Sequence, residues 1–208
     1  MISMRMKASV NEEVEGQKLE GKARFLSCFD QDRPVWVLAY GSLLWNPGFA
    51  VASRCQVRVV GWHRSFCLYS YCYRGSKDYP GLVLGLDCGG HVESLALEIQ
   101  AKQAHDAMGY LWDREMITHA YIPCVVPATT KDGTIIRCHT FVIDQGHEQY
   151  AGRLSKAERL ALIRIAHGSG GSNVEYVLRT RKILDKYGIY DPELVEIATT
   201  LEMELSAK

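Results

Sequence analysis

Hydrophobic and polar positions divide the chain into an arm, a region of strands and a helical end. Residues 1–33 contain six basic and six acidic residues with few aromatic ones, which predicts a polar, solvated arm with one helix near Glu12–Leu26. From Pro34 the chain becomes strongly apolar. The run Val35–Tyr40 predicts a buried strand, and Gln56–Tyr73 predicts a second extended stretch.

The middle of the chain alternates between strand and helix patterns. Gly81–Asp87 and Val92–Ile99 flank a Cys-Gly-Gly step at residues 88–90, which predicts a hairpin turn. Residues 101–113 carry an apolar stripe at helical spacing. Ile117–Val126 and Thr134–Ile143 surround Lys-Asp-Gly at residues 131–133, which predicts a second hairpin.

The last third has helix start and stop signals. Ser155 to Glu158 forms a capping box whose helix we expect to end at Gly168, and Ser172 to Glu175 opens a helix that we expect to end at Gly188. Asp191 followed by proline opens another helix. Strands first and helices afterwards predict an α+β fold with a mainly antiparallel, barrel-like sheet, and residues 34–208 read as one domain.

Composition removes several functional classes. Among 208 residues, 24 Lys and Arg balance 24 Asp and Glu, so no overall basic field favours nucleic acid or an anionic membrane. No apolar run approaches the length of a membrane span, and the N-terminus lacks the apolar segment of a secretory signal, so we expect a cytoplasmic location. Seven scattered cysteines without a CxxC pair indicate reduced thiols, and no metal site is expected.

Two segments carry candidate chemistry, although the chain has no P-loop, GxSxG or HExxH signature. The strand from Val35 ends at Gly41-Ser42, where a glycine lets a ligand approach the main chain and turn N–H groups suit an anion; a plain tight turn is the alternative. The sequence Leu-Trp-Asp-Arg-Glu at 111–115 lies where helix gives way to strand. Glu115 is either a solvated cap or a carboxylate whose pKa the helix dipole raises and Arg114 lowers.

Six motifs in order along the chain resemble the ChaC-like γ-glutamylcyclotransferases, above all the bacterial members. They are Tyr40-Gly41-Ser42-Leu43-Leu44-Trp45-Asn46-Pro47, Gly61-Trp62-His63-Arg64-Ser65-Phe66-Cys67-Leu68, Arg74-Gly75-Ser76 with Pro80-Gly81, Leu111-Trp112 with Arg114-Glu115-Met116, Asp144 with His147 and Tyr150-Ala151-Gly152, and Gly171-Ser172-Asn173 with Tyr176. These matches run from about residue 34 to 190. The N-terminal arm lies outside them.

The resemblance implies a mixed β-barrel with surrounding helices and cleavage of glutathione to 5-oxoproline and Cys-Gly, without cofactor or metal. The family's catalytic glutamate matches Glu115, and its substrate loop matches Tyr40, Gly41, Ser42, Leu43 and Leu44. Arg74 is a further candidate for a substrate carboxylate. Tyr150 and Tyr176 either hydrogen-bond the substrate or complete the core.

The motifs are compatible with two other kinds of function. The same fold could serve a non-enzymatic regulator associated with cation transport, or a cyclotransferase for other γ-glutamyl amines or amino acids. The expected partner is a small-molecule substrate, with no nucleic acid and no membrane, and the expected state is a monomer.

Overall fold

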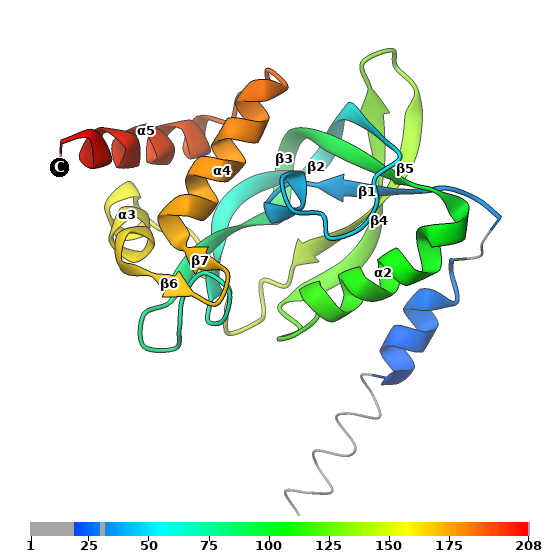
Figure 1. The fold of residues 1–208 in the computed structure, drawn as a ribbon, viewed down its shortest axis with the longest axis horizontal. Helices are drawn as coiled ribbons and strands as arrows, with labels where there is room; N and C mark the ends of the chain where they lie inside the picture. Colours follow the sequence, from blue (N-terminus) through cyan, green and yellow to red (C-terminus); the bar gives the residue numbers. More distant parts are fainter. Residues whose placement is uncertain (1–18, 30–31, 208) are drawn as a thin grey trace, which may run out of the picture.

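The computed structural model describes residues 19–29 and 32–207 of the chain. Its centre is a closed β-barrel with the strand order β1-β3-β2-β4-β5 (Figure 1). The strands are β1 (Val35–Ala39), β2 (Ser53–Ser70), β3 (Gly81–Ile99), β4 (Tyr121–Thr130) and β5 (Ile135–Ile143). Neighbouring strands are antiparallel except β1 and β5, which are parallel. The predicted mixed, mainly antiparallel barrel in an α+β fold is therefore confirmed.

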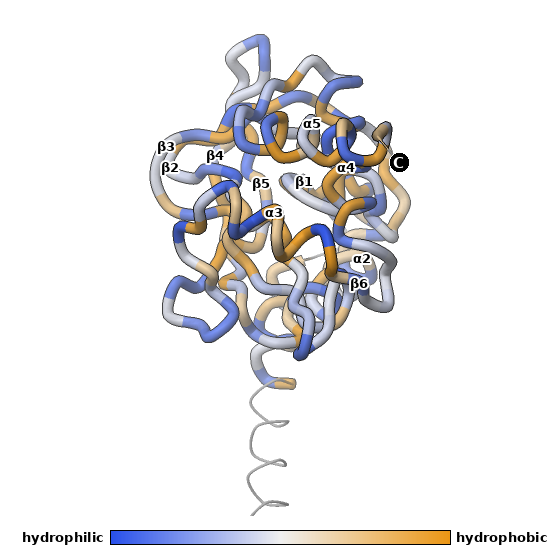
Figure 2. Tube along the Cα trace, turned by 90° about the vertical axis from the view of Figure 1, so that its left-hand side faces the viewer, coloured by the Kyte–Doolittle hydropathy of each residue, from blue (hydrophilic) through white to orange (hydrophobic). Residues whose placement is uncertain are grey.

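The helices cover the barrel on two sides. Helix α2 (Ala101–Glu115) lies on one side, and α3 (Lys156–Ile165), α4 (Asn173–Lys186) and α5 (Pro192–Ser206) group on another (Figure 1). Hydrophobic and hydrophilic residues alternate along these helices, as expected when one face of each is buried (Figure 2). The capping box at Ser155 and the proline start of α5 are both formed as the sequence predicts.

Alternate side chains of the barrel strands belong to two different apolar clusters. Leu38 and Tyr40 join a cluster made entirely of strand and strand-end side chains, which fills the barrel. Val37 and Ala39 join the larger cluster that includes side chains of α2, α3, α4 and α5. Successive side chains of a strand point to opposite faces, so β1 is buried on both sides and reads as one apolar run.

The hairpin predicted at residues 88–90 is wrong. β3 continues through this glycine pair and is antiparallel to β2 along almost its whole length. Gly89 and Gly90 have φ of +94° and +65°, and the β2–β3 register shifts between Val60 and Trp62. The glycines therefore make a bulged bend rather than a reversal, because each arm pairs with β2 instead of with the other arm.

Other boundaries shift by a few residues. β4 begins at Tyr121 rather than Ile117, and α3 ends at Ile165 rather than Gly168. His167-Gly168 (β6) and Gly171-Ser172 (β7) instead form a short two-stranded sheet that leads into α4. Sequence patterns do not show this sheet because each strand has only two residues.

Residues 19–29 are not a solvated arm. Residues 19–26 are helical and lie beside α2 in Figure 1. The rings of Phe25 and Trp112 are 5.0 Å apart, those of Phe29 and His139 are 4.7 Å apart, and Phe29 is buried. Residues 1–18 and 30–31 of the predicted arm lie outside the described ranges.

Candidate active site

The loop after β1 is held in place by buried side chains, and it has backbone N–H groups that are free to bind a ligand. It forms a short 3-10 turn, η1 (Ser42–Leu44), in which Leu43 and Leu44 are buried. The first hydrogen bond of the turn runs from Leu44 N to Gly41 O at 3.0 Å, so the N–H groups of Ser42 and Leu43 have no acceptor inside it. Trp45 donates from Nε1 to Thr180 Oγ1 at 3.1 Å, which fixes the end of the loop to α4.

Gly41 lies directly against a buried tyrosine. A Cβ atom at this position would be 3.0 Å from the hydroxyl oxygen of Tyr176. That hydroxyl also accepts a hydrogen bond from Leu84 N at 3.1 Å, so the ring cannot move away freely. The glycine thus allows the close approach of loop, strand β3 and helix α4.

Glu115 is the last residue of α2, and Arg114 connects it to this loop. The guanidinium of Arg114 donates to Ser42 Oγ and Asn46 O, each at 2.7 Å, and its Nε lies 3.2 Å from Glu115 Oε1. One arginine therefore connects the carboxylate to the loop. The sequence shows the adjacent Arg and Glu but not this bridge across 72 residues.

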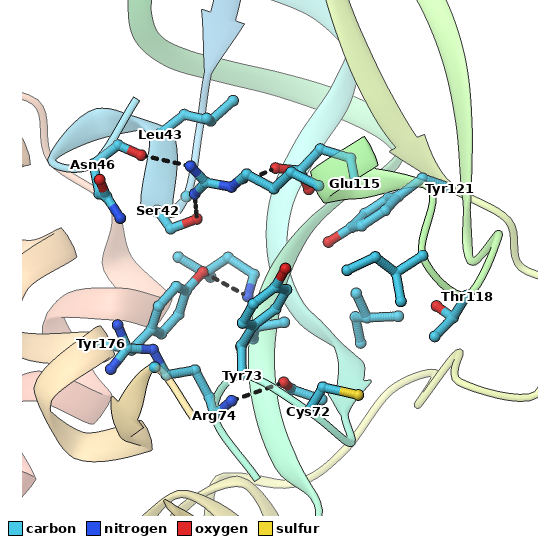
Figure 3. A pocket seen from close by; sticks show the side chains of 18 of the residues that line it. Ser42, Leu43, Asn46, Cys72, Tyr73, Arg74, Glu115, Thr118, Tyr121 and Tyr176 are labelled. Atoms are coloured by element: carbon cyan, nitrogen blue, oxygen red, sulfur yellow. Dashed lines mark hydrogen bonds and ion pairs between the residues drawn. The ribbon is translucent and has the colours of Figure 1, made fainter. Parts of the chain in front are cut away.

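A cavity of about 580 Å³ opens between the loop and the end of α2. In Figure 3, Ser42 and Tyr176 lie on one side and Glu115 and Tyr121 on the other, and Tyr73 points between them. Cavities of this size suit small-molecule ligands. Several of the lining residues are tyrosines, whose rings form part of the cavity wall and whose hydroxyls can supply hydrogen bonds.

Burial sets the protonation behaviour of the site. It raises the pKa of Glu115 above its ordinary value of 4.5, and Arg114 partly opposes this increase. The expected lowering by Arg114 is therefore present, but the largest cause is burial, which the sequence analysis did not invoke. Burial also raises the pKa of Tyr40, Tyr121 and Tyr176, so these hydroxyls are neutral at neutral pH and can donate hydrogen bonds.

Most residues singled out from the sequence meet at this cavity. Its lining includes Glu115 and the predicted binding residues Tyr40, Gly41, Ser42, Leu43, Arg74 and Tyr176. Leu44 is buried beneath the loop and stands outside the described lining residues.

Tyr150 also stands outside the described lining residues. Its hydroxyl donates to Asp87 Oδ2 at 2.7 Å, and Gln145 donates to the same carboxylate. For this tyrosine, the contacts favour the structural alternative over a contact with substrate.

Several lining residues escaped the sequence analysis. Tyr121, the first residue of β4, lies outside the motifs that the sequence analysis singled out. Tyr69, Tyr71 and Tyr73 alternate in a short stretch just before Arg74, and this alternation was a visible sign of an aromatic wall. Arg179 and Glu175, one turn apart on α4, also line the cavity.

The described residues include no cluster of three or more His, Cys, Asp or Glu side chains that suits a metal ion. In the same part of the chain, no helix is long and apolar enough to cross a membrane. The seven cysteines are all free thiols.

The model of the family described as ChaC-like protein matches residues 35–204. The chain belongs to the ChaC-like family. It is 32% identical over 190 residues to the glutathione-specific gamma-glutamylcyclotransferase of Escherichia coli K12, a match that covers 91% of this chain and 82% of that protein. It is 26% identical over 174 residues to glutathione-specific gamma-glutamylcyclotransferase 1 of Danio rerio, covering 80% of this chain and 88% of the relative.

A solved structure has the same fold as this ChaC-like chain. The crystal structure of a yeast gamma-glutamyl cyclotransferase specific to glutathione superposes with a TM-score of 0.74, covering 83% of this chain and 97% of the yeast chain at 20% sequence identity. This likeness concerns the fold. The family match begins at residue 35, so the docked segment 19–29 lies outside it.

Proposed function

We propose that this protein cleaves glutathione by cyclising its γ-glutamyl group, releasing 5-oxoproline and Cys-Gly. The observation that carries the proposal is a partly buried carboxylate, Glu115, with a raised pKa, facing the open backbone of the Gly41–Leu43 loop across one cavity. The names of the relatives point to the same substrate.

The reaction needs a proton carrier rather than a covalent nucleophile. The α-amino group of the substrate attacks its own γ-carbonyl, and such intramolecular attack reaches effective molarities of roughly 10⁵–10⁸ M when well oriented. An α-amino group has a reference pKa of about 8, so its deprotonation at pH 7 costs about 1.4 kcal/mol. The raised pKa of Glu115 reduces the mismatch between the carboxylate and this amine.

We assign Glu115 both proton transfers. The neutral α-amine attacks the γ-carbon, and Glu115 accepts one of its two N–H protons as the C–N bond forms and the carbonyl oxygen becomes an oxyanion. Glu115 then protonates the cysteinyl nitrogen as the former amide bond breaks. Arg114, 3.2 Å away, stabilises the ionised form of Glu115 before the first transfer and after the second.

The Tyr40–Leu44 loop holds the substrate in this proposal. The N–H groups of Ser42 and Leu43 bind the α-carboxylate of the glutamyl unit, which carries a full charge already in the ground state. Tyr176 lines the cavity beside the loop, and its neutral hydroxyl packs on Gly41. Leu44 anchors the loop from below.

We further propose that residues 34–208 act as one domain, as a monomer, in the cytoplasm and without metal or cofactor. The free thiols of all seven cysteines suit a reducing compartment. Light scattering of the purified protein tests the monomer.

The test is to incubate the protein with glutathione and measure 5-oxoproline and Cys-Gly. Equal amounts of the two products are expected, and γ-glutamylalanine and a γ-glutamylamine should react more slowly than glutathione. A folded protein that releases no 5-oxoproline would refute the enzyme, whereas faster turnover of the other compounds would refute glutathione as its substrate.

A further inference from the structure

A pair of arginines beside the loop remains without a role in the reaction above. Glu175 and Arg179 lie one turn apart on α4, and Arg74 reaches the same carboxylate from the segment between β2 and β3. Arg179 Nη2 is 2.7 Å from Glu175 Oε1, and Arg74 Nη1 is 3.3 Å from Glu175 Oε2. All three residues line the cavity.

This cluster carries a surplus positive charge. Two guanidinium groups share the one carboxylate of Glu175. The remaining charged groups among the described lining residues are already matched: Arg114 lies 3.2 Å from Glu115, and Asp113 lies 2.6 Å from Lys22. The cavity is therefore positive at the α4 side and close to neutral at the α2 side.

The two arginines are held on one aromatic ring. The guanidinium carbons of Arg74 and Arg179 lie 5.4 Å and 5.2 Å from the ring centroid of Trp45. Thr180 fixes this indole by accepting its N–H. Stacking restrains the planar guanidinium groups, so less conformational freedom is lost when they bind an anion.

The two arginine side chains differ in how far they are exposed to solvent. The side chain of Arg74 is 9% exposed, and it also donates to Ser172 O at 3.1 Å, so it is largely occupied within the protein. The side chain of Arg179 is 55% exposed and lies at the rim of the cavity. A group that protrudes from the cavity meets Arg179 first.

We propose that Arg179, supported by Arg74 and stacked on Trp45, binds the free carboxylate at the far end of a γ-glutamyl peptide. This inference rests on the proposed function and adds the substrate class: γ-glutamyl peptides whose terminal carboxylate lies one residue beyond the γ-linked residue, as the glycine carboxylate of glutathione does. γ-Glutamylamines lack this group. Arg179 is thus a specificity-determining residue that acts on the leaving part of the substrate.

The experiment compares glutathione with its C-terminal carboxamide, which has the same shape but no terminal charge. Wild-type protein is expected to prefer glutathione by about tenfold in kcat/KM, the lower range of one charge-assisted hydrogen bond at a half-exposed site. In Arg179→Gln this preference should disappear, because turnover of glutathione falls while that of the carboxamide is unchanged.

Arg181→Gln is the matched control, since Arg181 lies on the same helix and pairs with Asp185, 2.6 Å away. It should keep the wild-type preference. The proposal is overturned if wild-type protein treats both peptides alike, or if Arg179→Gln retains the preference. It is also overturned if Arg179→Gln weakens both peptides equally, because that result would assign Arg179 to the α-carboxylate.

A binding measurement tests the carboxylate site independently of the proposed reaction. Calorimetric titration of Glu115→Gln with each peptide measures affinity without turnover. Glutathione should bind about tenfold more tightly than the carboxamide to Glu115→Gln, and equally to Glu115→Gln combined with Arg179→Gln. Equal affinities in the single variant would overturn the carboxylate site even if the reaction is confirmed, and unequal ones would support it even if no 5-oxoproline forms.

Discussion

Replacing Asp191 with asparagine tests the buried ion pair that connects the loop side of the barrel to α5. Arg64 Nη1 is 2.8 Å from Asp191 Oδ2, and the two side chains are 2% and 12% exposed. The same guanidinium donates to Tyr40 O at 2.7 Å and to Ser94 Oγ at 2.9 Å. Asp191 also caps α5 by accepting from Leu194 N at 3.0 Å. Asparagine caps a helix as well as aspartate does, so this change removes mainly the charge.

The expected cost follows from the burial of both partners. Breaking a buried pair costs about 3–5 kcal/mol, because the remaining charge stays buried without its counter-charge. Arg64 keeps other acceptors, so we expect the lower end, about 3 kcal/mol. In a domain of this size each kcal/mol lowers the melting temperature by about 2–4 °C, which gives a decrease of about 6–12 °C.

The assay is urea unfolding followed by circular dichroism, with thermal melts as a second measure. Asp185→Asn provides the control, because its pair with Arg181 is at 2.6 Å but the side chains are 24% and 51% exposed. This exposed pair should contribute less than about 1 kcal/mol. The reasoning is refuted if Asp191→Asn stays within 1 kcal/mol of wild-type protein or loses no more stability than the control.

Three further changes test the site. Gly41→Ala places a Cβ 3.0 Å from the hydroxyl oxygen of Tyr176; overpacking should cost about 1–3 kcal/mol and raise KM, and unchanged unfolding and kinetics would contradict the close packing. Because burial raises the pKa of Glu115, kcat/KM should fall as the pH falls through that raised value, and Arg114→Gln should move this decline to higher pH by removing the opposing charge; an unmoved pH profile would argue against the pair. Tyr150→Phe should retain near-normal kcat/KM, because the hydroxyl of Tyr150 donates to Asp87 and Tyr150 stands outside the described lining residues. A large increase in KM would instead indicate that this hydroxyl contacts the substrate.

The sequence predicts the strands and helices best where a local pattern coincides with a local contact. Val35–Tyr40 is an unbroken apolar run because both faces of β1 are buried, and Ser155 forms the capping box that its spacing indicates. The glycine pair at residues 89–90 misleads because a bulge and a hairpin turn both use glycine with positive φ. Pairing with β2 decides between them, and that partner is distant in sequence.

The candidate site shows the same limit. Glu115 and the Tyr40–Leu44 loop were found through motifs, whereas the bridge that joins them depends on Arg114 reaching Ser42 and Asn46. Charge balance at the cavity could not be read from the sequence, because it depends on which groups the fold pairs. The packing of residues 19–29 on α2 was missed because Phe25 and Phe29 stand among many charged residues.

The fold of a Glu115→Gln variant can be checked independently of turnover. In wild-type protein, folding raises the pKa of Glu115 above its ordinary value of 4.5. The stability that this carboxyl contributes is therefore present below pH 4.5 and is lost as the pH rises through the raised pKa of the folded state. At neutral pH the glutamine variant should therefore unfold at higher urea concentration than wild-type protein. At pH 4 the difference should be small.

The most direct measurement of the central claim is 5-oxoproline release from glutathione by Glu115→Gln beside wild-type protein. General acid–base catalysis contributes about 10²–10⁴-fold to a rate. We predict that the folded variant binds glutathione but releases 5-oxoproline at least about 100-fold more slowly. A folded variant that turns glutathione over at a near-normal rate would contradict the account and assign the proton transfers to another residue.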